Sequence, residues 1–436
     1  MAFIPNIVFA IVLVLGIGFF VRNVRKLVRN IRTGKPVDRS DHRRERLANM
    51  ARIALGQQKM VVRPVAGILH IMVYLGFIVI NLEVLEIIID GLLGTHRVFS
   101  SLGGFYTVLI GTFEILAFLV LVSVIVFWIR RNIIRLQRFR KPEMKGWPKN
   151  DGNLILYFEM VLMVLFLVMN ATDVPFQQMG RGNVISGIIA PWFGGLPEAT
   201  LHLIERTAWW LHIVGILVFL NYLYYSKHLH IILAFPNTYF AGLAPKGQMD
   251  NLEAVTKEVK LMMDPNADPF AAPAGAEGEQ GEMPEKFGAS DVSDLNWVQL
   301  LSAYTCTECG RCTSECPANQ TGKKLSPRKI MMDTRDRLEE VGKNIDNNGT
   351  FVADNKSLLD DYITREELWA CTSCNACVEA CPVSINPLSI ILDMRRYLVM
   401  EQSAAPAELN NMMTNIENNG APWPYNQMDR LNWKNE

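Results

Sequence analysis

The sequence has no cysteine before Cys306 and none after Cys381, so its eight cysteines all lie within one segment. No cysteine remains for disulfide bonds elsewhere, which excludes a disulfide-stabilised secreted fold. Clustered thiolates that await a metal would be oxidised outside the cytoplasm. We therefore expect the cysteine segment to face the cytoplasm.

The N-terminus lacks the features of a cleaved leader. Its first apolar stretch begins at Ile4-Pro5-Asn6 with no basic residues ahead of it, and no small-residue cleavage site precedes the charged segment that follows. This stretch is expected to be an uncleaved membrane anchor. The net charge is zero, with 43 basic and 43 acidic residues, so the sum says little about partners and the positions of the charges are more informative. No nucleic-acid partner is expected.

Long apolar runs, by contrast, are abundant. Half of the residues are hydrophobic (50%), and they concentrate in the first 235 residues. A helix needs about 20 apolar residues to cross a bilayer core. Five stretches meet or approach this length, at about 3–21, 65–89, 104–129, 153–171 and 205–227. They predict an all-α membrane domain of five transmembrane helices over residues 1–240, surrounded by the lipid bilayer.

The basic residues are distributed unevenly between the loops of this domain. A dense basic run from Arg22 to Arg46 separates the first two stretches, and a second run from Arg130 to Lys141 follows the third. The loop between the second and third stretches carries one Arg and one His. Loops rich in Lys and Arg remain in the cytoplasm. The pattern predicts an N-terminus outside a bacterial cytoplasmic (inner) membrane and everything after the fifth helix inside, in agreement with the cysteine argument.

The remaining chain divides by composition. Residues 241–290 are expected to be a flexible linker, because the sequence from about Asp250 to Ala289 is rich in Pro, Gly and Glu and poor in apolar side chains. Apolar periodicity returns at Leu295 and again from Leu388 to Leu398, which predicts helices on both sides of the cysteines. We expect a cytoplasmic α-helical dicluster ferredoxin-like domain at residues 291–400 and a C-terminal tail at residues 401–436.

The cysteines form two C-x2-C-x2-C-x3-C-P runs, closed by Pro317 and Pro382, with helical charged sequence from Met331 to Val341 between them. The first three thiolates of such a run can bind three corners of one [4Fe-4S] cluster, and the fourth normally serves the other cluster. One cluster is therefore expected on Cys306, Cys309, Cys312 and Cys381, and the second on Cys371, Cys374, Cys377 and Cys316. Ligands shared in this way place the two clusters about 12 Å apart, close enough for fast electron tunnelling.

A pair of four-cysteine zinc sites is the alternative, because C-x2-C is also a zinc-binding spacing. Zinc ribbons carry their ligands as two separated pairs, whereas here four cysteines are bunched twice, each time closed by a proline. The iron–sulfur interpretation is favoured, and an iron assay with EPR of the reduced protein separates the two.

Histidine is scarce, with seven in the chain, and three of them lie in or at the ends of the predicted membrane helices. His212 and His230 are five helical turns apart, so both are expected on one face of a continuous fifth helix, near opposite membrane faces. His70, near the cytoplasmic end of the second helix, lies at the depth of His230. Neutral imidazole is a usual axial ligand of haem. The matched depths predict a b-type haem held by His70 and His230.

His212 has no histidine partner on the second helix, where Ile80 and Asn81 stand at the corresponding depth. His96 and His202, both at the outer surface, are the two substitutes, and the sequence does not choose between them. One haem is therefore expected, and a second haem at His212 is left open.

Other polar side chains of the membrane half are interpreted first as structural. His228 does not fit the five-turn spacing and is expected to form interfacial hydrogen bonds. Glu114 falls in the middle of the third helix, with Glu83, Glu86 and Glu159 nearer the helix ends. A buried carboxyl is costly unless it is protonated and hydrogen-bonded. A structural role is favoured for Glu114, and a role in quinone binding or proton transfer is the alternative.

The membrane half resembles the gamma-subunit family of nitrate reductases, which are b-type cytochromes. The resemblance covers about residues 1–240 and is carried by the five spans, His70, His212 and the segment Tyr225-Ser226-Lys227-His228-Leu229-His230. In that family the fifth helix supplies one ligand to each of two haems, which implies His212 and His230 here. The second helix departs from the family pattern, with one histidine instead of two.

The cysteine half is similar to the ferredoxin-like subunit of heterodisulfide reductases and, most closely, to membrane-bound iron–sulfur oxidoreductases linked to electron-transfer flavoprotein. The likeness runs from Phe287-Gly288-Ala289-Ser290-Asp291 through Cys306-Thr307-Glu308-Cys309-Gly310-Arg311-Cys312 to Asn419-Gly420-Ala421-Pro422-Trp423 and Arg430-Leu431-Asn432-Trp433. Those proteins usually continue into cysteine-rich CCG modules, whereas this sequence holds no further cysteine. The resemblance implies a separate CCG-type iron–sulfur subunit as a partner, with electron-transfer flavoprotein as a further one.

The leading hypothesis from the sequence is a quinone-linked oxidoreductase subunit that is active in a complex. Electrons would pass between a cytoplasmic partner and the two clusters, then through b-type haem to menaquinone or ubiquinone, with no catalytic side chain assigned. Two alternatives stand beside it: a haem-free anchor for a soluble redox enzyme, and the membrane module of a sulfur-metabolism complex that drives disulfide or sulfite chemistry. Neighbouring genes and copurifying subunits distinguish these hypotheses.

Overall fold

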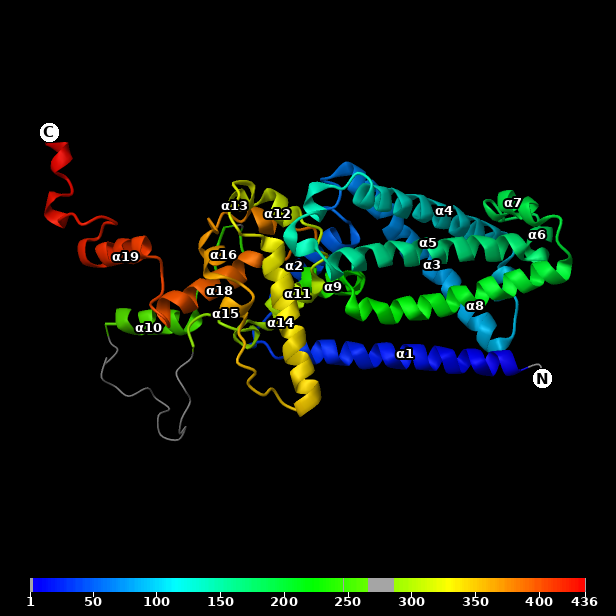
Figure 1. Cartoon of the computed structure of the whole chain (residues 1–436), viewed down its shortest axis with the longest axis horizontal. Coiled ribbons are helices and arrows are strands. Elements are labelled where there is room, and N and C mark those ends of the chain that lie inside the picture. The colour runs from blue at the N-terminus through cyan, green and yellow to red at the C-terminus, as the bar shows by residue number, and fades with distance from the viewer. Residues whose placement is uncertain (1–2, 246, 266–285, 436) are drawn as a thin grey trace.

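The computed structural model of the chain describes residues 3–245, 247–265 and 286–435. All regular elements within these ranges are helices. Figure 1 shows two parts along the long axis of the molecule: a bundle of long helices that contains the N-terminus, and a group of shorter helices that carries the cysteines. This arrangement confirms the predicted all-α fold.

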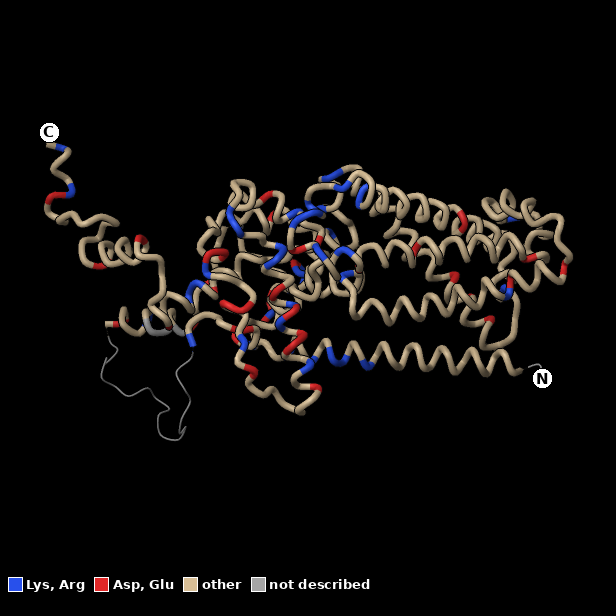
Figure 2. Tube along the Cα trace, viewed as in Figure 1, with Lys and Arg blue, Asp and Glu red and all other residues tan. Residues whose placement is uncertain are grey.

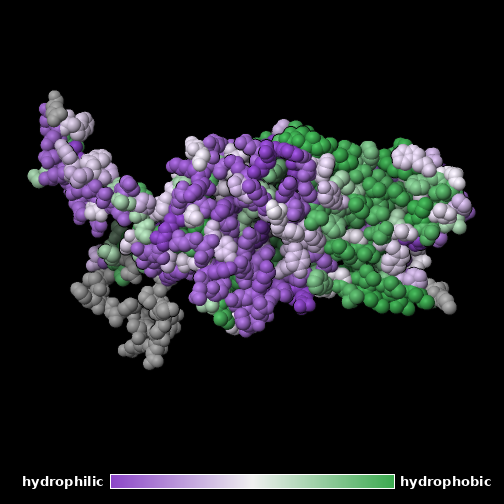
Figure 3. Space-filling model, in the orientation of Figure 1, coloured by the Kyte–Doolittle hydropathy of each residue, from purple (hydrophilic) through white to green (hydrophobic). Residues whose placement is uncertain are grey.

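Five helices of the bundle are long and apolar enough to cross a membrane, which confirms the five predicted spans. They are α1 (Ile4–Ile31), α3 (Pro64–Leu93), α4 (Gly104–Asn132), α5 (Trp147–Thr172) and α8 (Glu198–Tyr222). Figure 3 shows a continuous hydrophobic surface over the bundle, and Figure 2 shows Lys and Arg gathered where the bundle meets the cysteine half. The bundle therefore has the surface of a membrane domain.

The bundle helices pack in succession, α3 on α4, α4 on α5 and α5 on α8, while α1 lies along the edge against α3 and α8. Buried side chains from several helices fill the centre, among them Phe9, Ile110, Phe113 and Phe166. Little of α1 is buried, so most of its surface faces outward.

The fifth transmembrane helix ends earlier than predicted. α8 stops at Tyr222, two short 3-10 helices follow at Leu223–Tyr225 and Lys227–Leu229, and a new helix, α9 (His230–Phe240), begins at His230. Ser226, between the short helices, has an extended backbone with φ −118° and ψ 146°. The prediction that His212 and His230 share one face of a continuous helix is therefore wrong.

A buried carboxylate near the start of α5 holds this break. Asp151 accepts hydrogen bonds from the hydroxyls of Tyr222 at 2.5 Å and Ser226 at 2.6 Å, and from the backbone N–H of Lys227 at 3.1 Å. Such side-chain bonds offer polar groups an alternative to the hydrogen bonds of a continuous helix. Asp151 lies 76 residues from Lys227 in sequence, so helical periodicity alone could not reveal the contact.

Short helices complete both ends of the bundle. α2 (Arg43–Met50) and a π-helical turn at Ala51–Leu55 lie toward the cysteine half, whereas α6 (Val174–Gln178) and α7 (Ser186–Ile189) lie at the opposite end (Figure 1).

The cysteine half is built around α14 (Pro327–Asn348), which separates the two cysteine runs. The other helices are α11 (Trp297–Thr305), α12 (Arg311–Glu315), α13 (Pro317–Gln320), α15 (Leu358–Asp361), α16 (Arg365–Trp369), α17 (Ala376–Ala380) and α18 (Pro387–Met400). Leu300, Ile330 and Met394 are fully buried in a core shared by α11, α14 and α18. The helices predicted before, between and after the cysteine runs are therefore present.

The segment expected to be a flexible linker is partly structured. It contains α10 (Glu253–Met263), while residues 266–285 lie outside the described residues. At its end Gly288 has a φ of +78° and approaches α18 so closely that a Cβ would lie 2.2 Å from the carbonyl oxygen of Asp393. The backbone N–H of Ala289 donates to the same oxygen at 2.9 Å. The last residues of the expected linker therefore belong to the folded cysteine half.

The expected C-terminal tail contains a further helix, α19 (Ala407–Asn419). Figure 1 shows α19 and the residues after it projecting away from the rest of the molecule.

Direct contacts join the two halves in addition to the connecting chain. Lys26 and Arg29 of α1 form ion pairs with Asp346 of α14. The side-chain amide of Asn30 donates to the hydroxyl of Tyr304 at 3.0 Å. The cysteine half is therefore fixed against one end of the bundle, an arrangement that a flexible tether alone does not predict.

Candidate functional site

The two cysteine runs fold into loops with the same backbone turns. In the first loop Glu308 and Gly310 have positive φ angles of 52° and 71°. Ser373 and Asn375 occupy the corresponding positions in the second loop, with φ angles of 56° and 60°. Gly and Asn tolerate this left-handed conformation better than most residues. The duplicated run in the sequence is thus also a duplicated local structure.

The fourth cysteine of each run lies with the other loop. Cys316 lines a small cavity together with three cysteines of the second run, Cys371, Cys374 and Cys377. In turn, Cys381 contributes to the raised pKa of Cys306, and Cys309 contributes to the raised pKa of Cys381, so Cys381 lies near the first run. An exchange of this kind is expected where the fourth thiolate of each run serves the other cluster.

Burial shapes the chemistry of these thiols. Burial and the neighbouring thiols of Cys371 and Cys316 raise the pKa of Cys377 to about 12. Burial and the Cys309 thiol raise the pKa of Cys381 to about 11. Thiols with such pKa values stay protonated at neutral pH unless a metal stabilises the thiolate. These surroundings therefore do not suit catalytic thiols, whose pKa is lowered.

Backbone N–H groups also reach two of the sulfur atoms. Ser373 N–H donates to Cys371 Sγ at 3.4 Å, and Ile385 N–H donates to Cys381 Sγ at 3.3 Å. Hydrogen bonds to sulfur are one of the terms that set cluster potentials. Among the described residues, no group of three His, Cys, Asp or Glu side chains is arranged to hold a single metal ion.

A buried carboxylate links the first cysteine loop to the membrane bundle. Glu308, between Cys306 and Cys309, forms ion pairs with Lys227, just after the fifth span, and with Arg335 of α14 at 2.8 Å. Burial alone would raise the pKa of Glu308, but the charges of Lys227 and Arg335 hold it below its ordinary value. Removing one partner of a buried pair typically costs about 3–5 kcal/mol, so this contact fixes the loop against the bundle.

Arginines add hydrogen bonds at the same junction. Arg311, inside the first cysteine run, donates to the carbonyl oxygen of Lys59 at 2.8 Å. The fully buried Arg328 donates to the carboxylate of Glu143 at 2.7 Å and to the carbonyl oxygen of Arg138 at 2.7 Å. Loops from the bundle thus hold the first cysteine run from several sides.

A cavity of about 350 Å³, which we call the proximal cavity, lies between the first cysteine loop and the bundle. His70 of α3, His230 of α9 and Cys309 all line it. The rings of His70 and His230 have centroids 6.4 Å apart and planes inclined at 38°. A metal–nitrogen bond of about 2 Å and a ring radius of about 1 Å on each side give about 6 Å between imidazoles that share one iron. The two predicted ligands thus lie at a separation that fits one iron atom.

The surroundings of the two rings also fit a bound haem. His230 Nδ1 bonds to the carbonyl oxygen of Lys227 at 3.1 Å, which leaves Nε2 free to act as a ligand. His70 Nδ1 is buried without a hydrogen-bond partner among the described residues. The cavity is otherwise largely apolar, and four arginines that suit acidic groups line it: Arg130, Arg131, Arg138 and Arg311.

His228 lies in the same region but makes a different contact. Its Nε2 is 3.4 Å from the carboxylate of Glu159. His228 also lines the proximal cavity, and the hydrogen-bonding role expected for it stays a prediction.

His212 stands apart from this pair, deep in the bundle. It is 1% exposed, its Nδ1 bonds to the carbonyl oxygen of Leu162 at 3.0 Å, and its Nε2 has no partner among the described residues. The structure brings neither proposed substitute to it: His96 bonds to Asp173 at 3.1 Å, and His202 is exposed. One ring nitrogen of His212 is therefore oriented by the backbone and the other is unpaired.

Glu114 has a structural role. Its Oε1 accepts from the side-chain amide of Asn170 at 3.0 Å, and its Oε2 accepts from the backbone N–H groups of Ile185 at 2.8 Å and Ser186 at 3.0 Å. These bonds fix the start of α7 against α4 and α5. The favoured interpretation of Glu114 thus agrees with its contacts.

The sequence did not reveal three polar residues that position the site: Asp151, Lys227 and Glu308. Lys227 contacts both parts, because its ammonium group pairs with Glu308 and its carbonyl oxygen holds the His230 ring. A carboxylate between two cysteines of a C-x2-C pair is the one signal in the sequence that points to this contact.

The 4Fe-4S dicluster domain family matches residues 305–385, which contain all eight cysteines. This match identifies the cysteine half as a domain for two [4Fe-4S] clusters, as predicted, and not as a pair of zinc sites.

Similarity to known proteins extends over the whole chain. It is 30% identical over 99% of its length to the "Probable iron-sulfur-binding oxidoreductase FadF" of Bacillus subtilis, of which it covers 61%. It is 26% identical over 92% of its length to the EtfAB:quinone oxidoreductase of Syntrophomonas wolfei, of which it covers 55%. The chain thus spans less than two thirds of the length of these relatives.

The cysteine half is also similar to a shorter protein, one of the subunits of the ferredoxin/F(420)H(2)-dependent CoB-CoM heterodisulfide reductase of Methanosarcina acetivorans. The two are 35% identical over 27% of this chain and 60% of that protein. No solved structure matches the chain. The chain is a membrane-anchored iron–sulfur electron-transfer protein with a 4Fe-4S dicluster domain, related to these oxidoreductases and to heterodisulfide reductase subunits.

Proposed function

We propose that the chain transfers electrons between a redox partner at its cysteine half and the quinone pool, through two clusters and a b-type haem held by His70 and His230. One observation carries this proposal: Cys309 of the first cluster lines the same cavity as the two histidines. The residues that hold one redox group therefore adjoin the residues that hold the next.

When bound, the clusters and the haem take up and release one electron at a time, at potentials set by their ligands and surroundings. Two cysteines of each expected ligand set are buried, and Cys374 of the second set is the exposed one among the eight. The exposed Cys374 supports a soluble partner that meets the second set.

Lys227 fixes the position of the first cysteine loop relative to the ring of His230. Its ammonium group pairs with Glu308 inside the first cysteine loop, and its carbonyl oxygen orients the ring of His230. A shift of either part would move the other, because both contacts belong to one residue in a rigid turn. Electron transfer requires the protein to hold its redox groups at fixed relative positions, which such contacts do.

The proposed partner is a separate CCG-type iron–sulfur subunit, electron-transfer flavoprotein, or both. The basic residues gathered at the junction of the two halves support a cytoplasmic position for the cysteine half and an N-terminus outside (Figure 2). The name of the Syntrophomonas wolfei relative joins EtfAB to quinone, which supports the same pairing here.

The membrane module of a sulfur-metabolism complex is less favoured. Similarity to the heterodisulfide reductase protein covers 27% of the chain, whereas similarity to the two oxidoreductases covers 99% and 92%. The membrane half thus has relatives among the oxidoreductases. The alternative is a haem-free anchor, and the test must distinguish it from a path through haem.

The test uses the full-length chain, purified without oxygen and reconstituted in lipid nanodiscs. We expect about eight non-haem iron atoms per chain, four for each cluster, and the α band of a b-type haem in the reduced-minus-oxidised spectrum. A short-chain ubiquinone analogue should then reoxidise both. Clusters without a haem band would refute the haem path and favour the anchor.

A further inference from the structure

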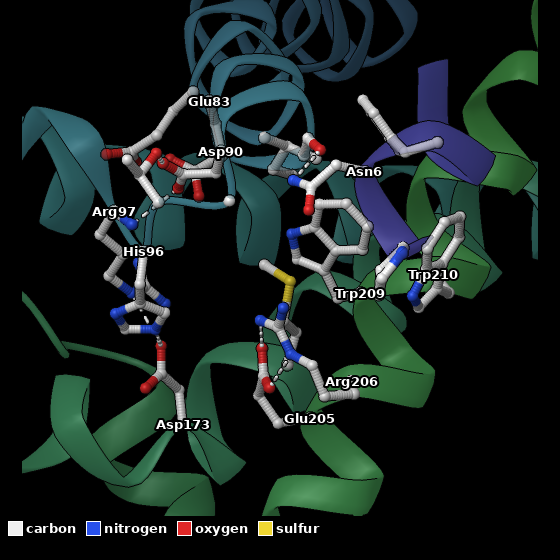
Figure 4. A pocket seen from close by; sticks show the side chains of 18 residues that line it. Asn6, Glu83, Asp90, His96, Arg97, Asp173, Glu205, Arg206, Trp209 and Trp210 are labelled. Atoms are coloured by element: carbon white, nitrogen blue, oxygen red, sulfur yellow. Dashed lines mark hydrogen bonds and ion pairs between the residues drawn. The ribbon is translucent and has the colours of Figure 1, made fainter. Parts of the chain in front are cut away.

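A second cavity, of about 330 Å³, lies at the end of the bundle away from the cysteines, and we call it the distal pocket. α1, α3, the loop after α3 and the start of α8 enclose it (Figure 4). Neither His70, His230 nor a cysteine is among the described residues that line it. It is therefore separate from the site described above.

One wall of the distal pocket carries two buried carboxylates of α3, Glu83 and Glu86, each 2% exposed. Glu86 is satisfied, because it accepts from the backbone N–H of Phe99 at 2.8 Å and from the hydroxyl of Tyr106 at 3.2 Å. Glu83 lies within hydrogen-bonding reach of Glu86, but its Oε2 atom has no hydrogen-bond partner among the described residues. An unsatisfied carboxyl within a membrane helix is costly and is typical of a functional site.

The facing wall is aromatic and comes from α1 and α8. The ring of Trp209 lies 5.4 Å from that of Phe9 and 5.3 Å from that of Trp210, measured between centroids. Trp209 is 8% exposed, no hydrogen bond joins its indole N–H to another described residue, and the guanidinium of Arg206 lies over its ring at 5.4 Å from the centroid. Figure 4 shows the nitrogen edge of Trp209 turned toward the space between it and Arg97. The pocket thus offers a hydrogen-bond donor beside an aromatic wall.

The charges of the pocket restrict its ligand. Five acidic residues line it against two arginines: Glu83, Glu86, Asp90, Asp173 and Glu205, with Arg97 and Arg206. Both arginines already pair with carboxylates, Arg97 with Asp173 and Arg206 with Glu205. An anion such as a lipid phosphate is therefore disfavoured. A neutral flat ring with carbonyl oxygens, which is the head group of a quinone, matches the aromatic wall, the free N–H and the unsatisfied carboxyl.

His212 lies on α8 beyond this pocket and lines neither of the two cavities. It lies three residues after Trp209, and so about one turn further along α8. Glu83, by contrast, lies about 20 Å along α3 from His70. His212 has an unpaired Nε2. It is therefore a candidate haem ligand between the proximal cavity and the distal pocket.

We propose that the distal pocket binds a quinone head group, with the Trp209 N–H donating to one carbonyl oxygen and Glu83 supplying a proton to the ring as electrons arrive. This inference rests on the proposed function, in which a reduced flavoprotein or iron–sulfur partner provides two electrons. Two protons accompany them, one from Glu83 and one from solvent in the pocket, so that both C=O groups become C–OH groups and the quinone becomes a hydroquinone. Glu83 regains its proton from solvent through the pocket, whose lining includes the half-exposed His96.

The test compares two conservative variants in nanodiscs, with decylubiquinone as the probe. Trp209→Phe keeps the ring and removes the donor, so its Kd for the probe should rise about five- to tenfold. Glu83→Gln keeps the shape and removes the proton, so its Kd should stay within about twofold while probe reduction slows by at least about 100-fold. Calorimetric titration measures the Kd, and stopped-flow absorbance measures the reduction rate.

Two controls isolate the effect. Trp192→Phe changes a tryptophan that is 80% exposed, and it should behave as wild type in both measurements. Iron content and melting temperature show that each variant folds, and Glu83→Asp should restore part of the lost rate because it restores an acid.

The outcomes separate this inference from the proposed function. If both variants bind and reduce the probe as wild type does, the quinone site lies elsewhere and the inference is overturned, while the proposed function stands. A change in only one variant overturns the role of the unaffected residue. A wild-type chain with reduced clusters that cannot reduce the probe refutes the proposed function itself.

Discussion

The rings of His70 and His230 meet across the proximal cavity with centroids 6.4 Å apart, although they belong to different helices, α3 and α9. His70 lies near the start of the bundle's second span, and His230 begins the helix that follows the break at Ser226. Their meeting depends on that break, which Asp151 holds through three hydrogen bonds.

The first prediction concerns this pair. His70→Ala and His230→Ala should each abolish the b-type haem band, because a haem that loses one of two axial ligands is no longer held from both sides. Cluster EPR signals should persist, since no cysteine is altered. His202→Ala is the matched control, because this histidine also lies in the membrane half but is 73% exposed. A haem band of wild-type intensity in both variants would contradict the assignment.

The second prediction concerns the exchange of the fourth cysteines. Cys316→Ala should eliminate the same EPR signal as Cys374→Ala, because Cys316 lines a cavity with the second run. Cys381→Ala should eliminate the same signal as Cys309→Ala. Redox-titrated EPR of the four variants provides the comparison. Grouping by position in the sequence, with Cys316 matching Cys309, would show that each run binds its own cluster.

The third prediction concerns the buried contact between the halves. Glu308→Gln leaves the charges of Lys227 and Arg335 without their partner, so the unfolding free energy should fall by about 3–5 kcal/mol. Loss of a negative charge between two cluster ligands should also raise the first cluster's potential, on the order of 100 mV at a few ångströms in an effective dielectric of about 20.

Glu315→Gln is the control for this variant. Glu315 lies in the same cysteine run and also pairs with an arginine, Arg63, but it is 51% exposed. Exposed pairs contribute about 0–1 kcal/mol, so neither stability nor potential should change measurably. Equal effects of the two variants in thermal unfolding and redox titration would argue against the bridging role of Glu308.

The fourth prediction concerns pH. Burial alone would raise the pKa of Asp173, but its bonds to His96 and Arg97 lower it to about 2. Because the folded-state pKa lies below the unfolded-state value, the ionised carboxylate stabilises the fold above about pH 4, and this stabilisation is lost as pH falls from about 4 to about 2. The shift corresponds to about 2 kcal/mol.

Asp173→Asn should therefore lower the unfolding free energy by about 2 kcal/mol at about pH 7, and the difference from wild type should vanish near about pH 2. Circular dichroism of the helices during thermal unfolding measures it, and only the difference between the two proteins is interpreted because acid affects the clusters of both alike. Glu198→Gln, at an exposed position, should show no pH-dependent difference. A difference that stays constant across this pH range would mean that Asp173 acts through its shape and not through its charge.

The five spans and the helices around the cysteines could be predicted, because bilayer thickness and apolar periodicity act locally on the sequence. The pairing of His70 with His230 also followed from depth along the chain, although the continuous helix behind that argument was wrong. Helical periodicity predicts an unbroken helix through Ser226 unless another residue bonds to the polar groups of that segment. Asp151, which is distant in sequence, accepts hydrogen bonds from those groups.

The contacts between the two halves could not be predicted for a similar reason. Glu308, Lys227 and Arg335 come from three distant segments, and each alone is an ordinary charged residue. The distal pocket shows the same limit: Glu83 was visible as a costly carboxyl, but only the fold places Trp209 opposite it. Most of what the structure shows beyond the sequence is therefore the pairing of polar residues that lie far apart in the chain.

In the proposed path, electrons reach quinone from the clusters through the site of His70 and His230. Stopped-flow absorbance of the fully reduced chain, mixed with decylubiquinone, tests it in wild type and in His230→Ala. We expect the wild-type clusters to reoxidise rapidly, whereas those of His230→Ala should stay reduced at least about 100-fold longer. Cluster reoxidation at the same rate in both proteins would contradict it.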